Sequence, residues 1–224
     1  PFAIVAAAMI CSALPMLILA DRAAPQGHQV IRMTGLFWLA PFVFIVGFAG
    51  GLFEMTAYTL LPIYTLSEGL SETASLYALS AFSAGGIGLQ YPLGRLADFA
   101  GRQALLMLNT TGILACLVAL PYAITESVLL IPLLFVWGGM VFGLYTTGLI
   151  MLGDKFRAGD LVAANALFII SFESGAVFGP ALSGGAMDLW PDHGFVRFLL
   201  AMAVLLMATI LYRNVRRRSV IPKN

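Results

Sequence analysis

The sequence predicts an all-α integral membrane protein, on the evidence of its composition, the length of its apolar stretches and the placement of its charges. The chain has 224 residues, of which 60% are hydrophobic and 10% are charged, and its mean hydropathy is +0.94. A soluble domain carries about 25% charged residues, so these few charges cannot cover a water-facing surface. Lipid is therefore the natural solvent for most of this sequence.

Seven apolar stretches are long enough to cross a bilayer as helices, each needing about 20 mostly apolar residues. They cover residues 1–20, 35–65, 73–93, 103–123, 127–152, 161–186 and 195–213. The second stretch exceeds one crossing, so we expect it to tilt or to protrude at one end. Short polar joints separate the stretches, and no second domain is predicted.

The first stretch begins at Pro1, without an initiator Met and without a basic region ahead of it. Both features disfavour a secretory signal peptide, although "ILADRAA" loosely resembles a cleavage site and keeps that alternative open. We expect the chain to be a fragment whose upstream part is missing.

The basic residues concentrate in every second joint, and this distribution predicts the orientation of the chain in the membrane. One side of the predicted membrane carries only Arg197, and the other carries Arg22, Arg32, Arg95, Arg102, Lys155, Arg157, Arg213, Arg216, Arg217, Arg218 and Lys223. Cytoplasmic loops carry the excess of Lys and Arg. We therefore expect the first, third and fifth joints and the C-terminal tail to be cytoplasmic. The tail segment "RNVRRR" is interpreted as a topological anchor, with a lipid-headgroup site as the alternative.

Several chemistries have no support in the sequence. Cys11 and Cys116 lie inside apolar runs and are expected to behave as small buried hydrophobic residues. His28 and His193 lie in predicted loops without the clustered partners of a metal site. No nucleotide-binding glycine loop with a lysine occurs, and nothing indicates nucleic acid. The spans contain no Lys or His, so we predict no enzyme, catalytic residue or cofactor.

The joint after the third span reads "YPLGRLADFAGRQALL" and suits a tight connection between two helices. Gly94 and Gly101 permit close approach and unusual dihedral angles. Asp98 can cap a helix N-terminus or pair with Arg102. The sequence therefore predicts a tight cytoplasmic turn at these four residues.

That joint resembles the signature loop of the major facilitator superfamily, G-x-L-a-D-r-x-G-r-k, through Gly94, Leu96, Asp98, Gly101 and Arg102. Phe99 and Gln103 depart from the pattern, which often has basic residues there, so the gating charges of the loop are incomplete. The stretches "LLPIYTLSEGLS", "WGGMVFGLYTTG" and "NALFIISFESGAVFGPALSGGAMD" are also similar to the C-terminal half of these transporters. The resemblance is greatest to a bacterial branch of small-solute and drug-type transporters.

The resemblance implies a twelve-helix fold in two six-helix halves, placed in a bacterial inner membrane with both termini cytoplasmic. Residues 1–20 would be the last helix of the N-terminal half, and residues 21–34 the central cytoplasmic loop. Residues 35–213 would form the six-helix C-terminal half with 3+3 inverted repeats, and residues 214–224 a cytoplasmic tail. The implied partners are a small-molecule substrate, protons, membrane lipid and the missing N-terminal half of the same protein.

Two carboxylates, Glu54 and Glu173, lie deep in predicted spans, where an acid costs a few kcal/mol and faces the bundle interior or a watery cavity. Glu54 shares one helical stripe with Gly47, Gly50, Gly51 and Tyr58, which could admit a close backbone, a water or a substrate. In the family this helix lines the central cavity, so we expect Glu54 to bind a proton or a cationic substrate. The alternative is a protonated acid that bonds to a neighbouring helix.

Glu173 corresponds to a helix at the boundary between the two halves, and small residues surround it. A structural or gating role is favoured, with a direct proton or substrate role as the alternative. Tyr58 and Tyr145 could offer a ring or a hydroxyl to a substrate, as could Trp137, Thr146 and Thr147, although packing explains each of them individually.

We therefore expect a secondary active transporter that moves a small organic solute or drug by alternating access. We further expect that transport is coupled to protons and runs in the direction of efflux. The rivals are a passive facilitator, and a non-transporting membrane sensor or assembly factor built on a transporter fold. A cavity with both acids accessible would favour transport, whereas a cavity plugged by large side chains would favour the sensor.

Overall fold

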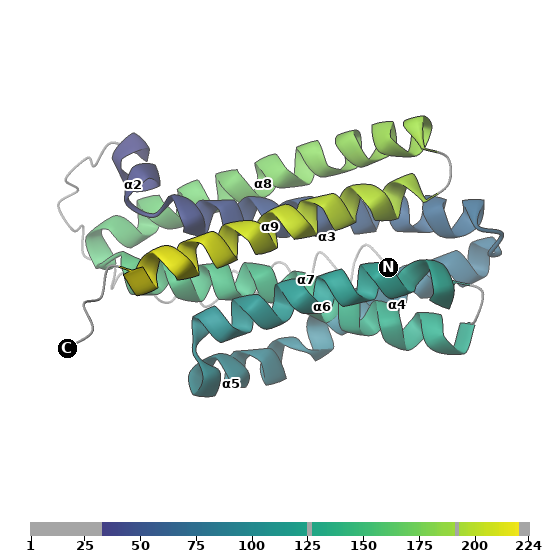
Figure 1. The fold of residues 1–224 in the computed structure, drawn as a ribbon, viewed down its shortest axis with the longest axis horizontal. Helices are drawn as coiled ribbons and strands as arrows, with labels where there is room; N and C mark the ends of the chain where they lie inside the picture. The colour runs from purple at the N-terminus through teal and green to yellow at the C-terminus, as the bar shows by residue number, and fades with distance from the viewer. Residues whose placement is uncertain (1–32, 125–126, 191–192, 220–224) are drawn as a thin grey trace, which may run out of the picture. The chain divides into compact units, whose positions relative to one another are not determined.

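The computed structural model describes residues 33–124, 127–190 and 193–219, and the regular structure in these ranges is helical (Figure 1). The helices are α2 (Met33–Leu39), α3 (Pro41–Ser67), α4 (Glu72–Gly88), α5 (Gln90–Ala100), α6 (Arg102–Ala123), α7 (Ser127–Lys155), α8 (Ala158–Leu189) and α9 (Gly194–Ser219). Within the described ranges, α3, α6, α7, α8 and α9 are long and apolar enough to cross a membrane. The predicted span 1–20 lies outside the described residues, as do Cys11 and His28.

The predicted span 35–65 is two helices, α2 and α3, which meet at Ala40. Ala40 leaves the helical region with φ −143° and ψ 51°, and Pro41 occupies the first position of α3. Proline has no amide N–H and its ring clashes with the preceding turn, so it starts a helix readily and interrupts a longer one. The 27 residues of α3 extend about 40 Å, enough to cross a hydrocarbon core of about 30 Å with tilt.

The predicted span 73–93 is also interrupted. Helix α4 is capped by the Ser71 hydroxyl, which accepts from the Ala74 amide at 3.2 Å, and it ends after 17 residues at Gly88. Helix α5 then begins at Gln90. Pro92 lacks the amide that would bond to the Gly88 carbonyl of a continuous helix, which explains the break. Helices α4 and α5 are each shorter than the membrane-length helices of the bundle.

Helices α3 and α8 form a long seam in which two glycines face the partner's backbone. A Cβ on Gly51 would collide with the carbonyl oxygen of Phe172, and a Cβ on Gly175 would collide with the carbonyl oxygen of Phe48. The two backbones can therefore approach only because both positions lack a side chain.

Helices α4 and α7 form a second seam with the same construction. A Cβ on Gly85 would collide with the carbonyl oxygen of Phe135, and a Cβ on Gly138 with that of Phe82. In all four helices the phenylalanine precedes the glycine by three residues. Each of α3, α4, α7 and α8 thus contributes one Phe-x-x-Gly pattern to these contacts, and we call the two contacts the glycine seams; the patterns are Phe48–Gly51, Phe82–Gly85, Phe135–Gly138 and Phe172–Gly175.

The main hydrophobic core lies where α3, α4, α6, α7 and α9 meet. At its centre the ring of Phe82 lies 5.0 Å from that of Trp137, which in turn contacts Phe195 at 6.3 Å. Trp137 is only 1% exposed, so the structure favours the packing interpretation of this residue. Cys116 is buried in the same core, as predicted.

The helix joints gather at two ends of the bundle (Figure 1). The α3–α4 and α8–α9 joints lie at one end, and the α5–α6 joint and the C-terminal end of α9 lie at the other. The first end carries Glu68, Glu72, Asp188 and Arg197, and the second carries Arg95, Asp98, Arg102, Asp154, Lys155, Arg157, Arg213 and Arg216. The basic residues are therefore segregated along the bundle axis, while which end is cytoplasmic remains a prediction.

Candidate functional site

Three helices converge where α3 carries its paired glycines. A Cβ on Gly50 would lie 3.6 Å from the Phe172 ring of α8 and 3.7 Å from the Tyr145 backbone nitrogen of α7. A Cβ on Gly47 would lie 2.8 Å from the Phe168 ring. The glycine stripe of α3 is therefore filled by α8 and its aromatic rings, and it does not stand open for water or substrate as the sequence had led us to consider.

The two predicted acids lie on the same pair of helices. Glu54 follows Gly51 by one helical turn on α3 and is half-buried, whereas Glu173 directly follows Phe172 on α8 and is exposed. Glu173 is close enough for its charge to act on Glu54. Within the described residues, neither carboxyl has a hydrogen bond or an ion pair to another side chain. In this part of the chain, nothing supports the alternative that Glu54 serves to bond a neighbouring helix.

Tyr58 lies one turn beyond Glu54 on α3 and is half-buried. Its ring packs edge-on against Phe82 of α4, with the ring centroids 5.8 Å apart, and against Phe142 of α7 at 6.4 Å. These two contacts hold the ring in place and support packing as at least one role of Tyr58.

Tyr145 on α7 has a matching arrangement. Its ring packs against Phe172 of α8 at 5.1 Å and against Phe168 at 5.5 Å. Tyr58 follows the glycine of its Phe-x-x-Gly pattern by seven residues, and Tyr145 does the same. Tyr58 of α3 contacts Phe82 of α4, and Tyr145 of α7 contacts Phe172 of α8. Both phenylalanines belong to a Phe-x-x-Gly pattern. The structure thus brings Tyr145 to the glycine pair that precedes Glu54, and it gives the two tyrosines equivalent surroundings.

The hydroxyls of Thr146 and Thr147 are engaged within the bundle. Thr146 donates to the Phe142 carbonyl at 3.3 Å, and Thr147 donates to the Gly143 carbonyl at 2.6 Å. Thr147 also accepts from the Asn109 side-chain amide at 3.2 Å, which links α7 to α6. These contacts favour helix packing over substrate binding for both threonines.

The segment predicted to be the signature loop is mostly helical. Helix α5 continues to Ala100, and the joint to α6 is the single residue Gly101, whose φ of 80° favours glycine. Asp98 lies near the C-terminal end of α5 and is exposed, so it caps no helix N-terminus. Gly94 lies within α5 and has open space around its Cα. Only Gly101 therefore uses the conformational freedom that the sequence analysis assigned to both glycines.

Arg102 pairs with a residue that sequence reasoning missed. Its guanidinium forms an ion pair with Asp154 at the C-terminal end of α7, and not with Asp98. The two side chains are 47% and 36% exposed, so solvent weakens the pair. The pair nevertheless ties the α5–α6 joint to the end of α7. The predicted loop "GDKFRAGD" contains Asp154, but no local spacing identifies its partner.

A second polar cluster at the opposite end was also missed. The Tyr64 hydroxyl lies 3.1 Å from His193 Nδ1, and the same nitrogen lies 3.0 Å from a Glu68 carboxylate oxygen. His193 has a φ of 59°, which is uncommon outside glycine. The spacing of Tyr64 and Glu68 places them on one helix face, but His193 is 129 residues from Tyr64. From the sequence alone we expected no role for this histidine.

A metal centre is not indicated by the described part of the chain, where no group of three His, Cys, Asp or Glu side chains could hold an ion. Of the predicted site residues on α3, α7 and α8, Glu173 is exposed, and Glu54, Tyr58 and Tyr145 are half-buried. Such a site can bind a proton, a cation or a polar organic molecule with an aromatic wall.

Comparison with known proteins gives the family. The family model described as Major Facilitator Superfamily matches residues 1–158 and again residues 43–224. An uncharacterized MFS-type transporter of Enterobacter sp. (strain 638) is 27% identical over 155 residues, covering 69% of this chain and 39% of the relative. The uncharacterized MFS-type transporter YcaD of Escherichia fergusonii is 28% identical over 162 residues, covering 72% of this chain and 41% of the relative.

An uncharacterized MFS-type transporter of Yersinia enterocolitica is 28% identical over 154 residues, which cover 69% of this chain and 39% of the relative. The matched region thus spans about two-fifths of the length of each of these relatives. Because the family model matches along the whole sequence and the structure is an all-helical bundle with several membrane-length helices, the chain belongs to the major facilitator superfamily.

Proposed function

We propose that this chain forms the C-terminal half of a proton-coupled secondary transporter for a small organic solute or drug, and that Glu54 is its proton- or cation-binding group. Alternating access of the two halves around a central site is the mechanism that such proteins use. One observation carries the proposal. Glu173 is exposed and Glu54 is half-buried, the two lie close enough for their charges to interact, and neither has a side-chain partner within the described residues. A pair of acids without side-chain partners favours a role in binding a proton or a cation over a purely structural role.

The glycine seams support the repeat architecture of this mechanism. If α3 corresponds to α7, and α4 to α8, then Gly51 corresponds to Gly138 and Tyr58 to Tyr145. The same exchange converts the α3–α8 seam into the α7–α4 seam. Inverted repeats in secondary transporters place the binding site at their interface. The two tyrosines and Glu54 would then line that interface.

The pair of acids suggests how exchange would work. Two carboxylates at short range repel each other when both are charged, and one cation placed between them relieves that repulsion. A proton and a cationic substrate would therefore compete for Glu54. This competition couples substrate movement to proton movement, because binding of the substrate displaces the proton and binding of the proton displaces the substrate.

The test is transport by the purified full-length protein in sealed vesicles, across a panel of small cationic and neutral compounds, with and without an imposed proton gradient. Glu54→Gln keeps the size and most hydrogen bonding of the side chain but cannot titrate. We expect this variant to fold normally, to lose gradient-driven transport and to bind substrate with little dependence on pH. Glu72→Gln, an exposed acid at the first turn of α4, is the matched control and should transport as the wild type does.

Three outcomes would change the assignment. Wild-type transport and pH dependence in Glu54→Gln would remove this residue from the mechanism. Transport that ignores the proton gradient would identify a passive facilitator. Binding without transport of any compound in the panel would favour the sensor. Glu173→Gln should move the midpoint of the pH dependence without abolishing transport, since Glu173 acts on Glu54 through its charge.

A further inference from the structure

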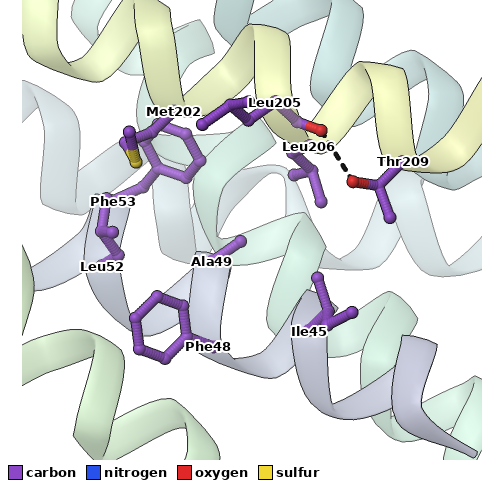
Figure 2. Close-up of a pocket in the computed structure, with 9 residues that line it drawn as sticks. All are labelled: Ile45, Phe48, Ala49, Leu52, Phe53, Met202, Leu205, Leu206 and Thr209. Atoms are coloured by element: carbon purple, nitrogen blue, oxygen red, sulfur yellow. Dashed lines mark hydrogen bonds between the residues drawn. The ribbon is translucent and has the colours of Figure 1, made fainter.

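A cavity of about 160 Å³ lies between α3 and α9 (Figure 2). Its walls are apolar, and its one polar lining residue, Thr209, already donates its hydroxyl to the Leu205 carbonyl at 2.8 Å. A polar solute or an ordered water would find no partner there, so the cavity suits hydrocarbon. Ile45 and Leu205 line it and are 41% and 59% exposed, so the cavity opens at the surface as a groove.

The groove exists because α9 contacts α3 sparsely. Helix α6 packs closely along α7, whereas α9 meets α3 over a much smaller contact. Ala49 contributes to this difference, since its small side chain lines the middle of the groove (Figure 2). The remaining space is open to an occupant that is apolar, flexible and narrow.

One end of the groove carries positive charge. Arg213 lies one turn beyond Thr209 on α9, and its guanidinium carbon lies 4.0 Å from the centre of the Phe42 ring, one turn before Ile45 on α3. Arg216 follows on the next turn and is exposed. Helices α2 and α9 contain no acidic residue and the first turn of α3 has none, whereas α8, which contacts α2 and α9, carries Asp160 in its first turn; the basic residues therefore outnumber the acids of these helices at this end. The sequence of α9 continues with two further basic residues, Arg217 and Arg218.

The distance from the apolar end to the basic end matches one membrane leaflet. Met202 and Arg213 are eleven residues apart on α9, which is about 16 Å along the helix axis. Half of a hydrocarbon core of about 30 Å is about 15 Å. An acyl chain whose headgroup lies at Arg213 would therefore reach the cavity.

We propose that the α3–α9 groove is a binding site for an anionic phospholipid, with one acyl chain in the cavity and the phosphate at Arg213 and Arg216. Arginine presents several N–H donors in a planar fork that fits phosphate oxygens. The Phe42 ring holds the Arg213 guanidinium at the mouth of the groove. The site is separate from the acids and tyrosines of the proposed transport site.

The test is native mass spectrometry of the delipidated full-length protein, titrated with phosphatidylglycerol and with phosphatidylcholine of the same acyl chains. We expect phosphatidylglycerol to bind more tightly. The double variant Arg213→Gln/Arg216→Gln should weaken its binding about thirty-fold, since each basic residue near an anionic lipid contributes about fivefold. It should weaken phosphatidylcholine much less, because the choline ammonium offsets the phosphate charge of that lipid. Ala49→Leu should weaken both lipids, because it fills the groove.

Two controls on the same helix separate specific from general effects. Arg197→Gln removes a positive charge at the other end of α9, and Ala208→Leu adds bulk on an exposed face; both should bind lipid as the wild type does. If Arg213→Gln fails to fold because Phe42 loses its partner, Arg216→Gln alone should still weaken phosphatidylglycerol about fivefold.

Equal affinity for the two lipids would overturn the proposal, since the arginines would then not distinguish the anionic headgroup from the zwitterionic one. Unchanged binding in Ala49→Leu would also overturn it, because the acyl chain would then lie elsewhere. Displacement of the lipid by glycerol phosphate or inorganic phosphate at similar concentrations would show a phosphate site that needs no acyl chain, and would equally refute the groove.

Discussion

The glycine seam between α3 and α8 makes a sharp prediction, because two adjacent glycines of α3 differ in what surrounds them. A Cβ on Gly51 would meet the backbone carbonyl of Phe172, which cannot move without shifting α8. A Cβ on Gly50 would lie 3.6 Å from its nearest neighbour, an ordinary van der Waals contact. The same substitution to alanine should therefore be tolerated at one position and rejected at the next.

The magnitude follows from two opposing terms. Alanine favours a helix interior over glycine by about 1 kcal/mol, and this gain is the same at Gly50 and Gly51. Forcing a methyl group into a filled contact costs about 1–3 kcal/mol, and this loss falls only on Gly51→Ala. The difference in stability between the two variants should thus be about 1–3 kcal/mol, with Gly50→Ala equal to the wild type or slightly more stable.

The assay is thermal unfolding of the full-length protein in detergent, followed by loss of the monodisperse peak on gel filtration. Each kcal/mol corresponds to roughly 2–4 °C for a domain of this size, so Gly51→Ala should melt several degrees below Gly50→Ala. Gly184→Ala on α8, which has open space around it, is a second control and should not lower the melting temperature. Equal melting of the Gly50 and Gly51 variants would refute the close backbone contact.

Three further predictions follow from the two ends of the bundle. Arg102→Asp and Asp154→Arg should each slow transport several-fold, because an exposed pair contributes up to about 1 kcal/mol, and the double swap should restore the rate; no recovery would mean that the pair is incidental. Tyr64→Phe should destabilise the protein by about 0.5–1.5 kcal/mol through loss of the His193 contact, measured by the same unfolding assay. A cysteine replacing Lys155 should be labelled only from the cytoplasm of sealed cells, and labelling from outside would reverse the predicted orientation.

The positions of several membrane-length helices and many of their ends could be predicted from the sequence, because membrane length and hydropathy are local properties. The predicted span 103–123 differs by one residue from α6, and Gly194 begins α9 one residue before the predicted 195. The spans 35–65 and 73–93 were wrong as single helices. In both, a proline within the apolar run breaks the helix, a signal that hydropathy alone does not contain.

The candidate site could be predicted only in part. Helical spacing placed Glu54 and Tyr58 on one stripe of α3, but it could not show that α8 fills the neighbouring glycines. The partner of Arg102 was missed because Asp154 lies in another joint of the chain. The Phe-x-x-Gly pattern was readable in the sequence, yet only the contacts show that each glycine faces the carbonyl of the phenylalanine on another helix.

The reciprocal form of the glycine seams also limits how these helices can slide. Each seam has two contacts, one from each helix, and each contact needs a glycine opposite a carbonyl. A shift of α8 along α3 by one residue in one direction would bring Leu52 and Ala176 opposite the two carbonyls, and a shift in the other direction would bring Ser174 opposite the Phe48 carbonyl. Neither position accepts a side chain. Shear within a seam is therefore blocked in both directions. Any rearrangement of this bundle must carry α3 with α8 and α4 with α7, as two stiff pairs that pivot against each other.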